Sequence, residues 1–254
     1  MKQNPYHSTR YFYATAPLPC PYMPGRVERR VVTELLGRDV DQLHDTLSQA
    51  GFRRSHGIAY APACPDCDAC KAVRTVAADF VPSRSLRRVA RLNEDIRVRE
   101  MEPLASAEHF DAFVAYQNAR HDDGDMARMD FSDYRALIEE SPVDTMVVEF
   151  RDADDSLFGV CLTDRLVDGL SAVYSFFDPA LSPRSPGSLM ILWLIERAQA
   201  IGLPYVYLGF WIAECSKMSY KERFGPLEVH TRAGWVPLFG DEQNAAVGMT
   251  QTVA

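Results

Sequence analysis

The chain has 254 residues, 47% of them hydrophobic and 24% charged, which allows one large domain or two modest ones with real cores. No apolar run approaches the roughly 18 residues of a membrane span, and the first residues lack the apolar segment of a signal peptide. We therefore expect a cytoplasmic protein with no membrane partner. The net charge of −8 is uneven: residues 1–99 carry 16 basic and 10 acidic side chains, a balance of +6, whereas residues 100–254 have a balance of −14.

The first hundred residues predict a short series of helices and strands. Residues 27–36 follow a helical pattern that Gly37 would end, and residues 38–51 predict an amphipathic helix. Residues 52–60 alternate weakly and predict a strand, and residues 71–80 predict another. A loop would join these two strands.

Three cysteines lie within seven residues of that loop. Cys64, Cys67 and Cys70 follow one another at a spacing of three, and Cys20 in a proline-rich segment is the natural fourth member. Disulfides are improbable in the cytoplasm. Such spacing therefore predicts thiols that bind a metal, bind a cluster or remain reduced.

The densest basic stretch, residues 84–91, contains Arg84, Arg87, Arg88 and Arg91 and is expected to be helical. Its arginines could meet a phosphate backbone or an acidic peptide, or form a solvated helix face. After a short strand at residues 96–99 we place a domain boundary near residue 100. This predicts an N-terminal domain over 1–100, a C-terminal domain over 101–240 and a flexible tail over 241–254.

The C-terminal part changes from helices to strands. Helices are expected at 109–120 and 132–140, with a polar elbow between them that holds His121 and Asp122. Residues 145–150 and 157–165 predict a hairpin, and residues 170–177 a third strand. A proline-rich loop then leads into an apolar helix over 188–200 and a strand over 205–209.

This order of elements predicts an α/β (α+β) fold with a central mixed sheet. A strand, a loop, a helix and a further strand are typical of acyltransferases of the GNAT type, in which the loop and the helix N-terminus hold the acyl donor. After the last of these strands, Lys217 and Lys221 lie four residues apart, a spacing that would place them on one face of a helix. Lys217 could meet a phosphate or simply be solvated, whereas Lys221 is expected at the surface. Cys161 and Cys215 are expected to be small buried side chains.

Five separate motifs carry a resemblance to a known family. They are residues 20–26, 52–70, 83–88, 119–126 and 207–221. In this order they resemble the bacterial aspartate/glutamate leucyltransferases, the bacterial branch of the arginyl-tRNA–protein transferases, from about residue 11 to residue 238. Ala61 departs from the pattern, in which an arginine is expected.

The resemblance implies an aminoacyltransferase of the N-degron pathway. Leucyl-tRNA would donate leucine to the α-amine of a protein that begins with Asp or Glu, which marks that protein for degradation. Aminolysis of an ester is downhill and requires no cofactor. By the same likeness, Cys20, Cys64, Cys67 and Cys70 could hold an iron–sulfur cluster or zinc, as a regulator or brace of the basic domain.

Site residues follow from the tasks of this reaction. His121 or Asp122 is the expected proton acceptor, with Tyr174 and Tyr207 also expected at the site. Other expected residues are Arg26, Arg53, Arg54 and Arg74 for the acidic side chain of the acceptor; Arg84, Arg87, Arg88, Arg91 and Lys217 for tRNA; and Asp178, Gly187 and Ser188 for the donor pocket.

Two other classes of function remain open. A coenzyme A-dependent N-acetyltransferase would use the same sheet, but its pyrophosphate loop usually offers several glycine N–H groups, whereas residues 182–187 contain one glycine and two prolines. A non-enzymatic cysteine-cluster module that binds nucleic acid is the second alternative. Neither the oligomeric state nor the choice between leucyl- and arginyl-tRNA follows from the residues alone.

Overall fold

The computed structural model describes residues 9–120 and 124–239. The expected catalytic residues His121 and Asp122, together with the expected tail over 241–254, lie outside these ranges. Within the described ranges, no helix has the length and apolar content needed to cross a membrane.

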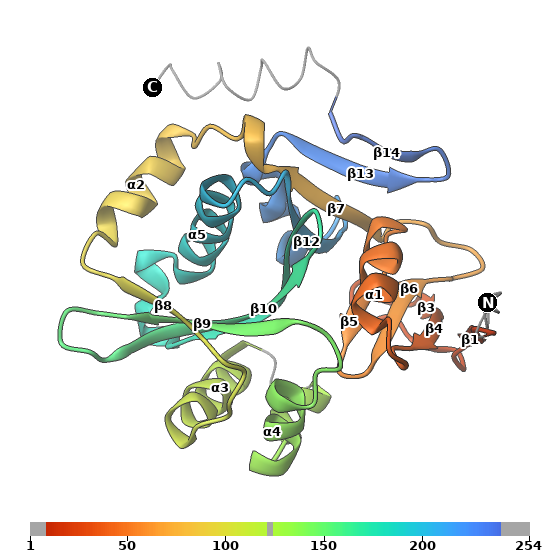
Figure 1. Cartoon of the computed structure of the whole chain (residues 1–254), viewed down its shortest axis with the longest axis horizontal. Helices are drawn as coiled ribbons and strands as arrows, with labels where there is room; N and C mark the ends of the chain where they lie inside the picture. Colours follow the sequence, from red (N-terminus) through yellow and green to blue (C-terminus); the bar gives the residue numbers. More distant parts are fainter. Residues whose placement is uncertain (1–8, 121–123, 240–254) are drawn as a thin grey trace, which may run out of the picture.

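A twisted sheet of eight strands forms the centre of the molecule (Figure 1). The strand order across this sheet is β14-β13-β7-β12-β11-β10-β9-β8, and only β11 and β12 pair in parallel. The strands are β7 (Lys71–Val76), β8 (Arg97–Met101), β9 (Thr145–Arg151), β10 (Leu157–Leu166), β11 (Gly169–Phe177), β12 (Tyr205–Trp211), β13 (Leu227–Thr231) and β14 (Gly234–Pro237). The expected mixed α/β fold with a central mixed sheet is confirmed.

A smaller antiparallel sheet stands beside one end of the large one (Figure 1). Its order is β1-β4-β6-β5, and a separate ribbon pairs β2 with β3. These strands are β1 (Tyr13–Ala14), β2 (Leu18–Pro19), β3 (Val27–Glu28), β4 (Arg30–Glu34), β5 (Arg53–Ser55) and β6 (Ile58–Pro62). The cysteine loop joins β6 of the small sheet to β7 of the large sheet.

Helices cover both faces of the large sheet (Figure 1). α2 (Arg84–Leu92) and α5 (Pro186–Ala200) cover one face, and α3 (Ala107–Arg120) and α4 (Phe131–Glu139) cover the other. α1 (Val40–Gln49) packs with the small sheet. The short helices are α6 (Ser216–Ser219), η1 (Ala77–Asp79), η2 (Asp125–Arg128), η3 (Pro179–Arg184) and η4 (Tyr220–Phe224).

Alternation along the strands divides the core into two layers. On β9, Met146, Val148 and Phe150 face the α2–α5 layer, whereas Val147 faces the α3–α4 layer. Successive side chains of a strand point to opposite faces, so a strand covered by helices on both faces is apolar throughout. Residues 145–150 of β9 are all buried, and four of these six are apolar.

Most of the expected elements are present, but two expectations are wrong. The helices expected at 38–51, 84–91, 109–120, 132–140 and 188–200 and the strands expected at 145–150, 157–165, 170–177 and 205–209 are present within a few residues of these positions. The single strand expected at 52–60 is wrong, because a turn at His56, whose φ is 51°, divides these residues into the antiparallel strands β5 and β6. The helix expected at 27–36 is wrong, because these residues form β3 and β4. Val31, Val32 and Thr33 are β-branched and favour a strand, and β4 is held by pairing with β1 and β6.

The N-terminal hundred residues contribute to both sheets. β7 lies between β12 and β13 in the large sheet, and α2 packs on α5. The division at residue 100 stays a prediction, and the two parts that it separates share one sheet.

Candidate active site

The parallel strands β11 and β12 separate in the middle of the large sheet. Their register contains only three pairs, from Gly169 with Tyr205 to Ser171 with Tyr207, although β11 continues to Phe177 and β12 to Trp211. Beyond these pairs the two strands diverge. Backbone groups that would otherwise form a ladder therefore face an opening in the middle of the sheet.

A cavity of about 700 Å³ occupies this opening. Its walls come from residues 172–175 of β11 and residues 208–210 of β12, with Met190 and Ile191 of α5 beneath. A second cavity of about 600 Å³ adjoins it at the start of α5. The residues that line both are Tyr116, Arg120, Ser175, Lys217 and Tyr220.

The N-terminus of α5 forms one wall of the second cavity. Ser182, Ser185, Gly187 and Ser188 line it. Ser185 takes a left-handed conformation with φ of 56°, and its carbonyl accepts hydrogen bonds from Ser188 and Leu189. The wall is therefore made of hydroxyl groups and the positive end of a helix, a combination suited to a phosphate or a ribose.

Arg53 reaches from β5 into the gap between β11 and β12. Its Nη1 donates to Ser171 Oγ at 3.1 Å, and its Nη2 donates to the carbonyl of Ala172, the first residue beyond the last strand pair. Burial lowers the pKa of Arg53. Among the described residues no carboxylate lies within 4.0 Å of this guanidinium. A cation in the cavity wall without its own anion is suited to bind a carboxylate of a ligand.

Gly209 makes room for Arg53. Its φ is 78°, a conformation that favours glycine, and a Cβ at this position would lie 3.0 Å from Arg53 Nε and 3.1 Å from Cζ. The register of β12 with β7 also shifts between Tyr207 and Gly209. The irregularity in β12 thus lies where the guanidinium crosses the strand.

Lys221 lies in the wall of the same cavity. It is 6% exposed, and its Nζ donates to the carbonyl of Phe210 and contacts Met218 Sδ at 3.6 Å. Burial, with a smaller contribution from the charge of Arg53, lowers the pKa of Lys221 to about 7. The expectation that Lys221 is a surface residue is wrong, because η4 turns its side chain inward beneath β12.

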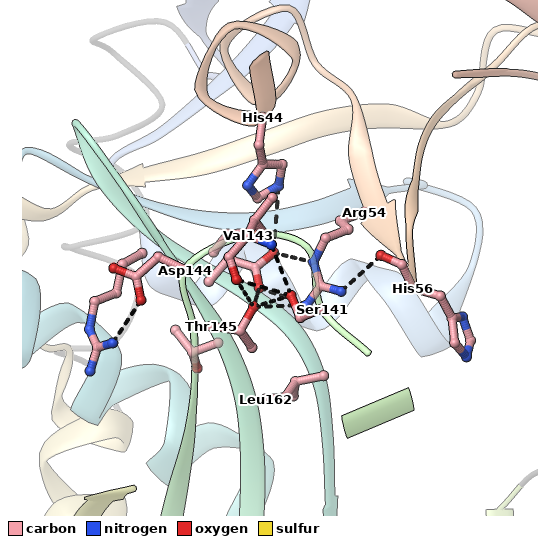
Figure 2. A network of polar contacts seen from close by, with 12 residues as sticks. His44, Arg54, His56, Ser141, Val143, Asp144, Thr145 and Leu162 are labelled. Atoms are coloured by element: carbon pink, nitrogen blue, oxygen red, sulfur yellow. Dashed lines mark hydrogen bonds and ion pairs between the residues drawn. The ribbon is translucent and has the colours of Figure 1, made fainter. Parts of the chain in front are cut away.

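The neighbouring Arg54 binds Asp164 instead of facing this cavity, and its polar network holds β5 to the large sheet (Figure 2). Its Nε and Nη2 each donate to Asp164 of β10 at 2.7 Å, and Thr145 Oγ1 donates to the same carboxylate at 2.8 Å. His44 Nε2 lies 3.5 Å from Asp164, and burial lowers the pKa of His44. Because this network fixes Arg54, it also fixes the strand that presents Arg53 to the cavity.

A second polar cluster lies where β11 and β12 still pair. The guanidinium of Arg74 stacks on Tyr205 at 3.4 Å from the ring centroid, pairs with Glu228 at 2.7 Å and donates to Tyr207 Oη at 3.0 Å. Tyr207 Oη in turn donates to Asp168 at 3.0 Å. The side chains of Arg74 and Tyr207 therefore bind partners within this cluster, and neither lines one of the two cavities.

All four cysteines of the expected cluster line one separate small cavity. Arg26 Nη1 donates to Cys67 Sγ at 3.1 Å, and a backbone hydrogen bond from Ala69 together with this contact lowers the pKa of Cys67. Burial and the other thiols raise the pKa of Cys70 to about 11. In residues 9–120 and 124–239, no three His, Cys, Asp or Glu side chains are placed to hold a metal ion.

Comparison with known proteins identifies the family. Residues 18–88 match the model of the arginine-tRNA-protein transferase N terminus, and residues 108–231 match that of the arginine-tRNA-protein transferase C terminus. The chain belongs to the arginine-tRNA-protein transferase family. It is therefore an aminoacyltransferase, and the expected family is confirmed.

Curated relatives of this transferase match over nearly their whole length. An aspartate/glutamate leucyltransferase of Paramagnetospirillum magneticum is 56% identical, over 92% of this chain and 96% of the relative. Proteins of the same name are 54% identical in Gluconacetobacter diazotrophicus (91% and 88%) and 51% identical in Rhodospirillum rubrum (93% and 96%).

The two cavities of this transferase bring together only part of the expected site. Arg53 and Tyr174 line the larger cavity, Gly187 and Ser188 line the smaller, and Lys217 lines both. Tyr174 Oη accepts a hydrogen bond from Gln117 Nε2 at 2.5 Å, and burial raises its pKa. These five residues stay candidates for the transfer site.

The other expected residues lie elsewhere. Arg54, Arg74 and Tyr207 are engaged in the two buried networks, and Arg26 lines the cysteine cavity. Asp178 caps η3, where its carboxylate accepts a hydrogen bond from the amide of Ala180. Arg84, Arg87, Arg88 and Arg91 are exposed along α2. Of the other cysteines, Cys161 is buried as expected, whereas Cys215 is only half-buried.

Sequence reasoning missed several side chains that line the large cavity, and three of them lie at its junction with the smaller cavity. These three are Tyr116 and Arg120, both on α3, and Tyr220 of η4. Arg120 lies over the ring of Phe177 at 5.3 Å. Arg120 and Tyr220 lie inside motifs that carry the family resemblance. The motifs therefore predicted which segments form the site, but not which of their side chains face the cavity.

Proposed function

We propose that this transferase moves leucine from leucyl-tRNA to the α-amine of proteins that begin with Asp or Glu. The curated relatives described above are named aspartate/glutamate leucyltransferases, which supports leucyl transfer to an acidic acceptor. The observation that carries the proposal is the cavity between β11 and β12, into which Arg53 projects without a carboxylate partner among the described residues. The tRNA donor would place the reaction in the cytoplasm, and the family implies that the product is marked for degradation.

The donor would enter along the basic side of the molecule. The four exposed arginines of α2 are suited to phosphates of the acceptor stem, and α2 packs against α5. From there the 3′ end would pass Gly187 and Ser188 at the start of α5. Arg120 and Lys217, which line both cavities, would hold its last phosphates at the entrance to the larger one.

The acceptor would place its first side chain at Arg53. A guanidinium binds a carboxylate through two parallel hydrogen bonds, which a neutral amide cannot reproduce with equal strength. Of the four arginines expected to bind the acidic side chain of the acceptor protein, only Arg53 lines this cavity. We therefore propose this binding role for Arg53 alone.

An acetyltransferase using coenzyme A is less compatible with the smaller cavity. The loop before α5 is pinned, because Arg184 donates to Asn93 Oδ1 at 3.0 Å and pairs with Asp95. Pro183 and Pro186 have no amide hydrogen to offer a pyrophosphate. The loop is therefore poor in the free N–H groups that such a ligand requires.

The proposed activity can be tested with labelled donors. Incubation with radiolabelled leucyl-tRNA is expected to label a peptide that begins with Asp or Glu, but not one that begins with Ala. Arginyl-tRNA and labelled acetyl coenzyme A serve as the alternative donors. Transfer from acetyl coenzyme A, or no label from leucyl-tRNA in the Asp peptide, would contradict the proposal.

The arginines of α2 give a second test. We expect the double variant Arg88→Gln, Arg91→Gln to bind leucyl-tRNA about tenfold more weakly. The slope of log K against log salt concentration should fall in magnitude by roughly one to two. The kcat at saturating donor should be unchanged. Filter binding across a salt series measures both quantities. Arg135→Gln on α4, which covers the opposite face of the sheet, is the matched control.

We propose that the cysteine loop stabilises the basic N-terminal part of the chain and takes no part in the transfer reaction. The four thiols share one cavity, but no three of them are arranged as a ligand set within the described residues. No step of the proposed reaction passes through this loop. Metal analysis after anaerobic purification would show whether zinc or an iron–sulfur cluster accompanies the thiols.

A further inference from the structure

Lys221 is a buried amine whose hydrogen-bond partners carry no negative charge. The carbonyl of Phe210 and the sulfur of Met218 are neutral acceptors for its Nζ. Neither offsets the free energy needed to bury an ammonium ion, which is large in the absence of an anion. An apolar side chain of similar length would fill the same space at η4.

The charged and titratable groups around Lys221 favour its neutral form. Arg53 of β5 lowers its pKa, and only the thiol of Cys215 acts weakly in the opposite direction. The other cations of the cavity are Arg120 of α3 and Lys217 of α6, and the remaining titratable groups are Cys161 of β10 and the cavity's tyrosines. Within the described residues no carboxylate lies within 4.0 Å of Lys221. A neutral amine at neutral pH can accept a proton.

The position of Lys221 matches a requirement of the proposed reaction. A protein N-terminus has a pKa near 8 and is largely an ammonium ion at pH 7, so it must lose a proton before it can attack an ester. An acceptor whose carboxylate pairs with Arg53 would place its α-ammonium in the cavity that Lys221 also lines. The acceptor's carboxylate would offset the repulsion between Arg53 and the protonated Lys221.

On the basis of the proposed function, we propose that Lys221 is a catalytic residue whose Nζ accepts the proton of the acceptor's α-ammonium group. The freed amine then attacks the leucyl ester carbon. The new C–N bond forms as the C–O bond to the terminal ribose breaks, and the second amine proton passes to the departing ribose oxygen. The proton held on Lys221 is released to solvent, so each transfer yields one amide, one deacylated tRNA and one proton.

The decisive variant is Lys221→Met, assayed with leucyl-tRNA and saturating Asp-starting peptide. We expect kcat at pH 7 to fall at least 100-fold, as for loss of a general base. The rise of the wild-type kcat with pH near 7 should move upward by more than one pH unit, while leucyl-tRNA binding stays within threefold. Arg99→Met, which removes an exposed cation on β8, should keep the wild-type rate and profile.

Folding of the variant is checked by its melting temperature. The pKa of Lys221 is lower in the folded state than its ordinary 10.5. The unfolded state therefore binds more protons between pH 7 and 10.5, and the wild type gains stability from this group as the pH rises through that window. Lys221→Met should melt at or above the wild-type temperature at pH 7, with the difference shrinking toward pH 10.5.

Direct titration of the lysines supplies a test that does not depend on an activity assay. The chain contains four lysines, at positions 2, 71, 217 and 221. With lysine labelled by ¹³C at Cε, one of four signals should titrate near pH 7, and it should be absent from Lys221→Met. Titration of all four above pH 9.5 would overturn the proposal.

Four outcomes are separable. A wild type that transfers no leucine refutes the proposed function, whereas an active wild type and a Lys221→Met variant with kcat within threefold refutes only the role of Lys221. A large loss of kcat with an unchanged pH profile would make Lys221 structural. A profile that is retained in Lys221→Met and lost in His121→Ala would assign the proton acceptor to His121.

Discussion

Arg54→Met is expected to lower the free energy of unfolding by about 3–5 kcal/mol, because it leaves the carboxylate of Asp164 buried without its cation. Asp164 is 0% exposed and Arg54 5% exposed, and the two share two hydrogen bonds of 2.7 Å. Thr145 and His44 (Figure 2) also contact Asp164 and would remain in the variant, but neither brings a fixed positive charge. Denaturant unfolding at pH 7 measures the loss.

An exposed ion pair provides the matched control. Arg165 Nη1 lies 3.0 Å from Asp144, and the Arg165 side chain is 42% exposed. Arg165→Met should therefore change stability by about 1 kcal/mol or less. In Arg54→Met combined with Asp164→Leu the uncompensated charge is gone, so we expect this double variant to be more stable than Arg54→Met alone. A loss below 1 kcal/mol in Arg54→Met would show that the network does not hold β5.

The regular elements were predictable because their signals are local. The apolar period of 38–51 and the sequences of the strand pair β9–β10 give the correct element types. The placement of β7 was not predictable, since this strand pairs with residues at least 129 positions away. Sheet order between distant segments depends on packing of the whole chain, which periodicity does not report.

The sequence predicted which types of side chain form the site, but not the directions in which individual side chains point. Arg53 and Arg54 are adjacent, and the pleat of β5 sends one to the cavity and the other to Asp164. Without the position of β5 relative to the large sheet, both arginines were equally good candidates. Lys221 was expected at the surface because lysine is rarely buried, and only the turn of η4 beneath Phe210 reveals that it is not.

Arg53→Met should cause the largest change in substrate selection. The guanidinium is held by Ser171 and Ala172 at the point where β11 and β12 separate, so it is positioned before a ligand binds. A hydrogen-bonded charge pair in such a place contributes about 1.5–3 kcal/mol. We therefore expect kcat/KM for an Asp-starting peptide to fall roughly 10- to 150-fold in Arg53→Met.

The ratio of kcat/KM between two acceptor peptides distinguishes a role in substrate selection from a general loss of activity. The wild type should prefer an Asp-starting over an Asn-starting peptide, and in Arg53→Met that preference should nearly disappear while leucyl-tRNA binding is retained. Arg53→Lys keeps a charge but loses the planar fork, so it should recover only part of the preference. If Arg53→Met slowed both peptides equally, the guanidinium would be a support for the split strands, and the acidic side chain would have to bind elsewhere in the cavity.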